Sequence, residues 1–247
     1  MSEPVFDIRG LSLAYGQRVA VQDVDLQIRP HETTVLIGSN GCGKSTLLKG
    51  LSRQLAPSSG TISFQGTELS QVRSKGYARD VALLPQTPVV PEGLTVAELV
   101  ARGRHPHRQW WGSPAAGDDE AVARALSMLS LQDFADRRVD ELSGGQRQRA
   151  WIALVLAQDT PVVLLDEPTA NLDPAATLAI EQLIQAAHRA GTTILMVTHD
   201  RDQARRLARR VLLLCRGRVV EDASAEAFFT APQSDEARAF LAGRLVF

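Results

Sequence analysis

Residues 38–46 read Gly38-Ser39-Asn40-Gly41-Cys42-Gly43-Lys44-Ser45-Thr46, a glycine-rich run that ends in a lysine and two hydroxyl residues. Its three glycines let the backbone turn tightly and point successive N–H groups inward, where a Cβ would interfere. Lys44 adds a positive charge within reach of the β- and γ-phosphates of a nucleotide, and the Ser45 hydroxyl is placed to bind Mg²⁺. The whole run is therefore a candidate ATP-binding loop.

The segments on either side of this loop predict a strand before it and a helix after it. Residues 33–37 are apolar or β-branched, and helix-forming residues continue from Lys44 to Leu51. A helix that begins at such a loop also offers the positive end of its dipole to an anion. The order strand, loop, helix is the context in which this pattern binds phosphate.

The rest of the chain predicts a mixed α/β protein. Alternating residues at 6–13 and 24–28 indicate an antiparallel sheet ahead of the loop. Further strand-like runs separated in several places by helical patterns indicate a mostly parallel core; they lie at 60–64, 81–84, 162–165, 193–197 and 211–214. Between residues 87 and 159 the pattern becomes helical, with a capping box at Thr95 and Glu98 and helices over 118–129 and 144–157. We expect short helices from residue 223 onward.

Composition is that of a soluble globular protein. The 247 residues are 44% hydrophobic and 22% charged, and the formal net charge is −1. The longest apolar runs are far shorter than the ~20 residues that a membrane-spanning helix needs. The N-terminus lacks the pattern of a secretory signal, and the two cysteines suggest no disulfide framework. These features favour the cytoplasm, and the near-zero charge gives no reason to expect nucleic acid as a partner.

A second candidate phosphate site lies at Leu142-Ser143-Gly144-Gly145-Gln146, which opens the helix predicted over 144–157. Ser143 and the N–H groups of Gly144 and Gly145 would sit at the positive end of the helix dipole. The site has no lysine of its own. Ordinary capping of the helix by Ser143 is the alternative interpretation.

Acidic and imidazole groups follow two of the predicted strands. The run 162–165 ends in Asp166 and Glu167, and the run 193–197 is followed by Thr198 and His199. Asp166 would assist Mg²⁺, Glu167 would orient or deprotonate an attacking water, and His199 would contact the γ-phosphate. A capping or packing role for His199 is the alternative.

Together these motifs resemble the nucleotide-binding subunit of an ATP-binding-cassette (ABC) transporter over nearly the whole chain. The family's motifs occur in order: the loop at 38–45, Gln86, the signature at 142–146, Asp166-Glu167, Asn171-Leu172-Asp173 and His199. The resemblance implies an α/β P-loop NTPase (RecA-like) core with an N-terminal antiparallel β subdomain, formed by 1–86 and 160–247, and a helical subdomain, 87–159, within one domain of residues 1–247.

The resemblance also implies roles for individual residues. Glu167, His199 and Gln86 would be catalytic, with Gln86 contacting both Mg²⁺ and the attacking water, and Tyr15 would stack on adenine. Ser45, Gln86 and Asp166 would hold the metal, and Asp173 would lie at a dimer contact. Two cassettes would face head to tail, so that Ser143, Gly144, Gly145 and Gln146 of one copy close over ATP held by the other.

Residues 98–113 and 143–158, above all 101–107 and 145–153, are similar to ATPases of ferric-siderophore importers. Haem and cobalamin importers share much of the pattern, and two motifs, Asn171-Leu172-Asp173-Pro174 and Met196-Val197-Thr198-His199, depart from the siderophore type. The similarity implies a membrane permease, a second and identical cassette, an indirect link to a substrate-binding protein, and a place at the cytoplasmic face of the membrane. A soluble cassette for cofactor assembly or nucleic-acid work is the alternative. A small P-loop kinase or GTPase would not need the signature.

Three further features have both functional and ordinary interpretations. His105 and His107 are too few to hold a metal, and we expect their loop to contact a membrane subunit. Trp110 and Trp111 would belong either to that contact or to a packed core. Arginines 201, 205, 206, 209 and 210 form a basic cluster, which we interpret as a solvated helix face.

Overall fold

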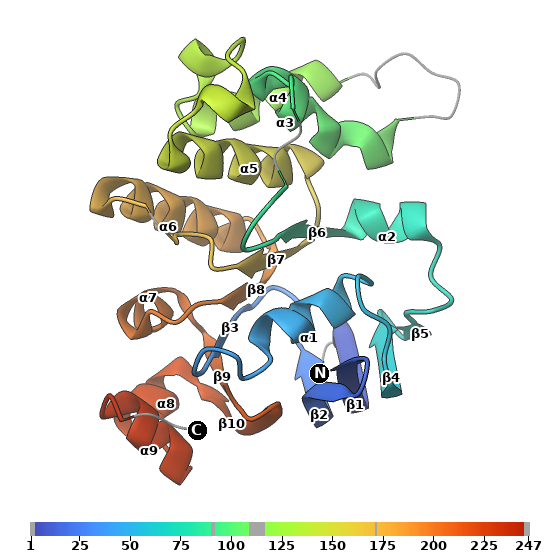
Figure 1. Ribbon diagram of the computed structural model, residues 1–247, viewed down its shortest axis with the longest axis vertical. Helices are drawn as coiled ribbons and strands as arrows, with labels where there is room; N and C mark the ends of the chain where they lie inside the picture. The colour runs from blue at the N-terminus through green and yellow to red at the C-terminus, as the bar shows by residue number, and fades with distance from the viewer. Residues whose placement is uncertain (1–2, 90–91, 109–116, 171, 245–247) are drawn as a thin grey trace. The chain divides into compact units, whose positions relative to one another are not determined.

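The glycine-rich loop joins a buried strand to a helix, as the sequence predicts. Strand β3 spans Thr33–Ile37 with every residue buried, and helix α1 spans Lys44–Leu51. The computed structural model describes residues 3–89, 92–108, 117–170 and 172–244 (Figure 1). Trp110, Trp111 and Asn171 lie outside the described residues.

The chain divides into two compact units. The first contains Met1–Val72, Leu164–Glu167 and Ile184–Phe247, and the second contains Arg73–Val163 and Pro168–Leu183. These boundaries differ from the expected ones at 86/87 and 159/160, because helix α2 (Ser74–Asp80) and most of helix α6 (Pro174–Arg189) group with the second unit. The division into a RecA-like core and a helical subdomain stays a prediction.

The parallel sheet of the first unit is built on β3. Strands β8 (Thr193–Val197) and β9 (Arg210–Cys215) pair with it in parallel on its two sides, and β10 (Arg218–Ser224) adds an antiparallel edge to β9. Strand β7 (Val162–Asp166), whose last residues belong to this unit, follows β8 in the strand order. All residues of β8 and β9 are buried, which explains why both strands are apolar after their first residues, Thr193 and Arg210.

The antiparallel sheet has the strand order β2-β1-β4-β5. Its strands are β1 (Phe6–Tyr15), β2 (Arg18–Ile28), β4 (Ser59–Phe64) and β5 (Thr67–Glu68). Assigning 60–64 to the parallel core was therefore wrong. In this segment only Ile62 and Phe64 are buried, and they pair with Ile8 and Phe6 of β1, with the two phenylalanine rings 5.3 Å apart. Alternate burial of this kind marks a strand with one solvated face.

The second unit is mainly helical. Strand β6 spans Val81–Leu84. Besides α2 and most of α6, this unit contains helices α3 (Val96–Ala101), α4 (Asp118–Met128) and α5 (Gly144–Gln158), with short 3-10 turns η1 (Arg102–His107), η2 (Gln132–Phe134) and η3 (Val139–Glu141). The capping box at Thr95 is present: its hydroxyl accepts a hydrogen bond from the Glu98 amide at 3.2 Å, and its own amide donates to the Glu98 carboxylate at 2.9 Å. The helices predicted over 118–129 and 144–157 are confirmed.

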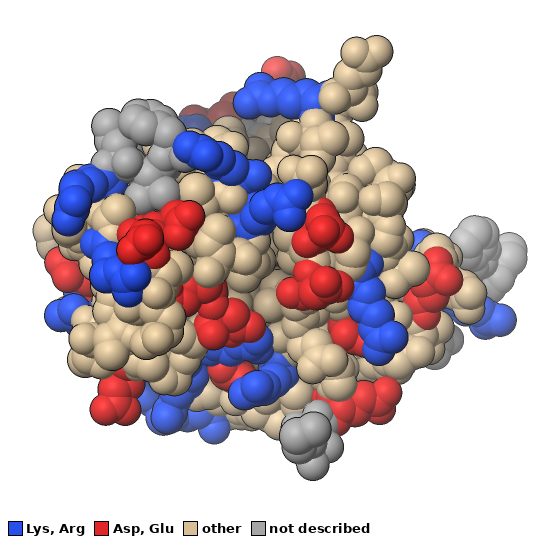
Figure 2. Space-filling view, turned by 90° about the horizontal axis from the view of Figure 1, so that it is seen from below, with Lys and Arg blue, Asp and Glu red and all other residues tan. Residues whose placement is uncertain are grey.

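Three further helices complete the first unit: α7 (Arg201–Leu207), α8 (Ala225–Thr230) and α9 (Asp235–Leu241). The last two confirm the helical tail, whereas β10 was not predicted. Among the described residues no helix is both long and apolar enough to cross a membrane. On the face shown in Figure 2, basic and acidic side chains are interspersed.

Candidate nucleotide-binding site

The loop glycines are required by close packing as well as by backbone conformation. Gly38, Gly41 and Gly43 all have positive φ, of 149°, 77° and 109°. A Cβ on Gly38 would lie 2.2 Å from the Leu214 carbonyl oxygen, and one on Gly43 would lie 2.4 Å from that of Ala20. No heavy atom lies within 4 Å of the corresponding position at Gly41, so there the backbone conformation alone favours glycine.

Lys44 is 7% exposed, and its ammonium group points back into the loop. Its Nζ donates to the carbonyl oxygens of Gly38 and Ser39, both at 2.9 Å, and lies 3.8 Å from the Cys42 sulfur. These partners are uncharged, and among the described residues Lys44 forms no ion pair with a carboxylate, although its charge acts on the nearby Asp166. Burial raises the pKa of the Cys42 thiol, although the neighbouring ammonium acts in the opposite direction. Cys42 is therefore a neutral packing residue in this structure.

Ser45 and Asp166 meet beside the loop. The Ser45 hydroxyl donates to Asp166 Oδ1 at 3.1 Å. Burial raises the pKa of the Asp166 carboxyl, the Ser45 hydrogen bond opposes this, and the nearby charge of Glu167 adds to it. A hydroxyl and one carboxylate fit Mg²⁺, which is usually held by one or two carboxylates together with substrate phosphates and water. Among the described residues no cluster of three or more His, Cys, Asp or Glu side chains could hold a metal, so substrate phosphates would have to complete such a site.

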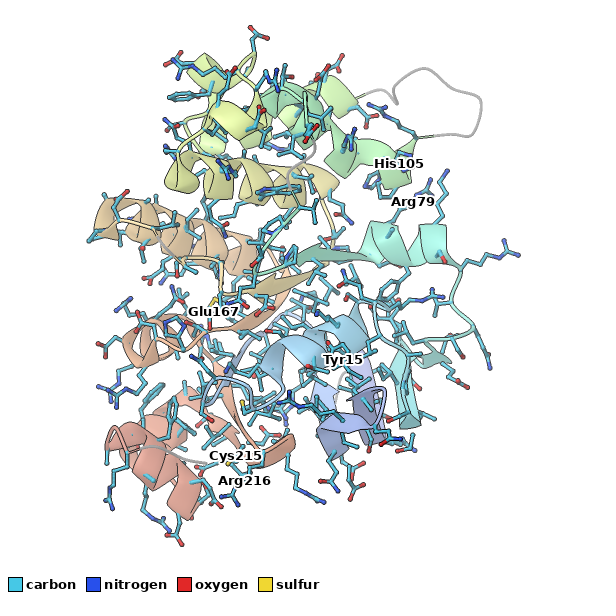
Figure 3. The ribbon with its side chains drawn as sticks, viewed as in Figure 1. Tyr15, Arg79, His105, Glu167, Cys215 and Arg216 are labelled. Carbon is cyan, nitrogen blue, oxygen red and sulfur yellow. The ribbon has the colours of Figure 1, made fainter. Side chains whose placement is uncertain are left out.

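Glu167 and His199 form a pair that the sequence analysis did not predict. His199 Nδ1 lies 2.8 Å from Glu167 Oε2, with the glutamate side chain 9% exposed and the histidine side chain 66% exposed (Glu167 is labelled in Figure 3). Glu167 has a φ of 52° and donates its amide to the Val197 carbonyl at 3.0 Å. A side chain in the left-handed region is uncommon, and here it follows the end of β7 directly. The pair places a carboxylate and an imidazole at the ends of two neighbouring strands.

Tyr15 ends strand β1 and is 46% exposed. The ammonium of Lys49, on helix α1, lies 5.5 Å from the centre of its ring. Val19, an apolar residue of the facing strand β2, is also exposed. An aromatic face beside the phosphate-loop helix is available for stacking, as its predicted contact with adenine requires.

In the second unit the signature opens helix α5, and Ser143 caps it. Its hydroxyl accepts a hydrogen bond from the Gln146 amide at 3.3 Å, and its amide donates to the Gln146 side chain at 3.0 Å. Ser143 therefore caps the helix, as the alternative interpretation predicted. In this cap the Ser143 hydroxyl is an acceptor, so its proton can still be donated to another group. No heavy atom lies within 4 Å of a Cβ built on Gly144, so the helix end is open at that point.

The structure brings the signature and Asp173 together. Both line a groove of about 430 Å³, whose walls are formed by Met128, Leu129, Ser130, Ser143, Gly145, Gln146, Arg149, Asp173, Ala175, Ala176 and Ala179. Asp173 also caps helix α6, because its Oδ1 accepts a hydrogen bond from the Ala176 amide at 2.9 Å. Gln86 follows β6 in this same unit and is exposed. The candidate residues thus form two groups, one in each unit.

The model of the ABC transporter family matches residues 21–170. The chain belongs to this family. It is 45% identical over 89% of its length to the probable siderophore transport system ATP-binding protein YusV of Bacillus subtilis (strain 168), covering 80% of that protein. It is 42% identical over 94% of its length to the ferric enterobactin transport ATP-binding protein FepC of Escherichia coli (strain K12), covering 86% of that protein.

Solved structures agree. An ATP-binding subunit of an ABC transporter superposes with a TM-score of 0.83 at 27% identity, over 96% of this chain and 99% of that one. A dimeric bacterial ABC transporter cassette gives a TM-score of 0.80 at 26% identity, over 89% and 98% of the two chains. The expected family and the P-loop NTPase fold are confirmed, and this chain is an ABC ATPase.

Proposed function

We propose that this ATPase is the energy-coupling subunit of an importer for ferric siderophores or related iron complexes, working as a head-to-tail dimer beneath a membrane permease. The main structural support for the proposal is that two phosphate-binding motifs lie in different units. The loop at 38–46 has a lysine and an adjacent carboxylate pair, whereas the signature at 143–146 has neither. Both motifs bind phosphate if the signature of each copy contacts the ATP that is held by the loop of the other copy.

The first unit supplies the chemistry in this proposal. Lys44 and the loop amides bind the phosphates, and Ser45 and Asp166 hold Mg²⁺, which would offset phosphate charge. Glu167 accepts a proton from the attacking water, and the 2.8 Å contact with His199 holds its carboxylate in place. Tyr15 stacks on adenine.

In this proposal, the second unit supplies the residues that close the dimer over ATP. The Ser143 hydroxyl and the amides of Gly144 and Gly145 bind the γ-phosphate held by the partner copy, and Asp173 lies at the contact between the copies. Gln86 reaches Mg²⁺ and the water in the closed state. Closing the dimer excludes water and completes the electrostatic stabilisation, and hydrolysis releases it.

The cargo assignment rests on relatives. The proteins named above are a siderophore and a ferric enterobactin transport protein, and an iron(3+)-hydroxamate import ATP-binding protein of Bacillus subtilis is 44% identical over 87% of this chain. By this analogy the cassette sits at the cytoplasmic face of the membrane, bound to the permease, and a substrate-binding protein delivers the iron complex. Haem and cobalamin remain alternative cargoes, and the permease-free alternative has no such support.

Uptake tests the proposal. Cells that carry wild-type protein or Glu167→Gln are given a panel of radiolabelled ferric siderophores, haem and cobalamin. We expect the variant to lose uptake of one iron complex and keep the others. Unchanged uptake of the whole panel would contradict the importer assignment.

A further inference from the structure

The hairpin turn between β9 and β10 lies against the glycine-rich loop (Cys215 and Arg216 are labelled in Figure 3). Cys215 pairs with Arg218, so the turn has two residues, Arg216 and Gly217, which we call the β9–β10 turn. Their φ angles are 48° and 79°, and two left-handed residues in succession are typical of a type I′ hairpin. The turn, the loop and strand β2 all belong to the first unit.

Gly217 is hydrogen-bonded through both of its backbone groups. Its amide donates to the carbonyl oxygen of Cys42, in the glycine-rich loop, at 2.9 Å. Its carbonyl oxygen accepts a hydrogen bond from the Gln22 amide of strand β2 at 2.8 Å. Strand β2 therefore holds the β9–β10 turn, and the turn holds one peptide group of the loop.

The hydrogen bond to Cys42 fixes the direction of the next amide in the loop. The described residues contain no cis peptide bond, and in a trans peptide the C=O and the N–H point in opposite directions. Because the Cys42 carbonyl points at the turn, the Gly43 amide of the same peptide points away from it. That amide donates no hydrogen bond within the described part of the chain, and Gly43 is the N-cap of helix α1. The Gly43 N–H is therefore free to bind an anion at the start of the helix.

Close backbone packing leaves no room for a side chain at Gly217. A Cβ there would lie 2.8 Å from the Ala20 carbonyl oxygen, the same atom that excludes a side chain from Gly43. The loop, the turn and strand β2 therefore meet at one carbonyl group. Leu214, near the end of β9, contacts the loop as well, because its side chain lies 3.3 Å from the Cβ position of Gly43. Packing this tight transmits a displacement of the turn to the loop.

We propose that Gly217 is a positioning residue for ATP, because the β9–β10 turn orients the Gly43 amide toward a phosphate oxygen of the nucleotide. The inference rests on the phosphate-binding role that the proposed function gives the loop. Lys44 supplies charge on a flexible side chain, whereas a backbone amide donates in one fixed direction. The turn sets that direction from outside the loop. Disturbing it should weaken nucleotide binding more than the chemical step assigned to Glu167.

Gly217→Ala tests the proposal, because the added Cβ would meet a backbone oxygen and would strain a residue with a φ of 79°. The matched control is Gly66→Ala in the two-residue turn between β4 and β5. The φ angles of that turn are 47° at Gln65 and 77° at Gly66, so the substitution imposes the same backbone strain. A Cβ on Gly66 would meet the carboxylate end of the Glu3 side chain, which can move away.

Affinity for ATP and ADP, KM, kcat and Tm are measured for both variants. We expect Gly217→Ala to weaken ATP and ADP binding by about 10–100-fold, as the loss of one hydrogen bond to a charged group predicts. Its KM should rise by a larger factor than its kcat falls. Gly66→Ala should keep wild-type affinity with a similar loss of Tm. Equal nucleotide affinity of the two variants overturns the positioning role and leaves the proposed function standing.

The amide signal of Gly43, observed by NMR in protein labelled with ¹⁵N-glycine, gives a readout that needs no variant. ADP should move this signal in the wild type, and should move it less in Gly217→Ala. A wild-type Gly43 signal that ADP does not move overturns the proposal even if Gly217→Ala fails to fold. Lys44→Ala separates the two failures, because normal nucleotide binding by that variant would overturn the phosphate-binding role of the loop and with it the proposed function.

Discussion

Asp166 and Glu167 are adjacent in sequence, yet the structure gives them different surroundings. Asp166 accepts a hydrogen bond from a loop hydroxyl, whereas Glu167 lies against an imidazole. The types and order of these residues could be predicted from the sequence. Their pairing could not, because it depends on the φ of 52° at Glu167 and on which strand ends next to which.

Glu167→Gln should retain ATP binding and lose hydrolysis by about 10²–10⁴-fold, the range for loss of a general base. The amide is nearly isosteric but cannot accept the proton. Single-turnover hydrolysis and nucleotide binding are measured side by side, with Glu120→Gln, an exposed glutamate on α4, as the control. Near-normal turnover in Glu167→Gln would remove this residue from the chemistry.

Asp166→Asn should stabilise the nucleotide-free protein at neutral pH and weaken Mg²⁺ binding. Burial raises the pKa of the Asp166 carboxyl, so the folded state is more stable when this carboxyl is protonated. This stabilisation is complete below the unfolded-state pKa and is lost as the pH rises through the folded-state pKa. We expect Tm to rise by about 2 °C, the shift that ~1 kcal/mol gives in a chain of this size. Thermal unfolding against pH measures this, and a variant less stable than wild type at neutral pH would contradict it.

At the scale of elements, helices and strands can be predicted best from the sequence where the local signals for them are strong. Capping boxes mark the starts of α3 and α5, and sequence periodicity predicts α4, because these signals are local to each helix. Strand pairing is harder. Residues 60–64 pair with β1 rather than with the parallel sheet, and β10 was missed, because both depend on partners far along the chain.

Glu221 of strand β10 is hydrogen-bonded to Ser234, the residue that caps helix α9. Burial alone would raise the pKa of Glu221, but the carboxylate accepts hydrogen bonds from the amides of Gln233 and Ser234 and from the Ser234 hydroxyl at 2.6 to 2.9 Å, and the net effect lowers its pKa. The stabilisation that the ionised Glu221 carboxylate gives the folded state is therefore complete above the unfolded-state pKa. It is lost as the pH falls through the folded-state pKa.

Glu221→Gln should cost about 1–3 kcal/mol of unfolding free energy at pH 7, since it removes charged hydrogen bonds. The difference from wild type should shrink in acid, where wild-type Glu221 is protonated. Urea unfolding at several pH values measures this, with the exposed Glu226→Gln on α8 as the control. A deficit that is the same at every pH would rule out the charged hydrogen bonds as its cause.

The whole molecule divides into two compact units, and in the proposed function each unit carries half of a nucleotide site. The sequence could predict both halves, because each is a local motif. It could not predict that Ser143 and Asp173 line a single groove, since 30 positions separate them and the groove depends on how α5 and α6 pack within the second unit. We infer that each half works with the other half of a second copy.

Two inactive variants test whether the halves are shared between copies. Lys44→Ala should lose nucleotide binding at its own loop, and Ser143→Arg should bind ATP but block closure over the ATP of its partner. Each homodimer is then inactive. A mixed dimer contains one site in which both halves are wild type, so mixing the variants should restore activity.

Steady-state ATP hydrolysis by a one-to-one mixture of Lys44→Ala and Ser143→Arg is therefore the most direct measurement. Random pairing predicts about a quarter of wild-type activity, because half of the dimers are mixed and each holds one intact site. Each variant alone should give background. If the mixture is no more active than the separate variants while both proteins fold and dimerise, the two halves act within one chain and the shared-site account is contradicted.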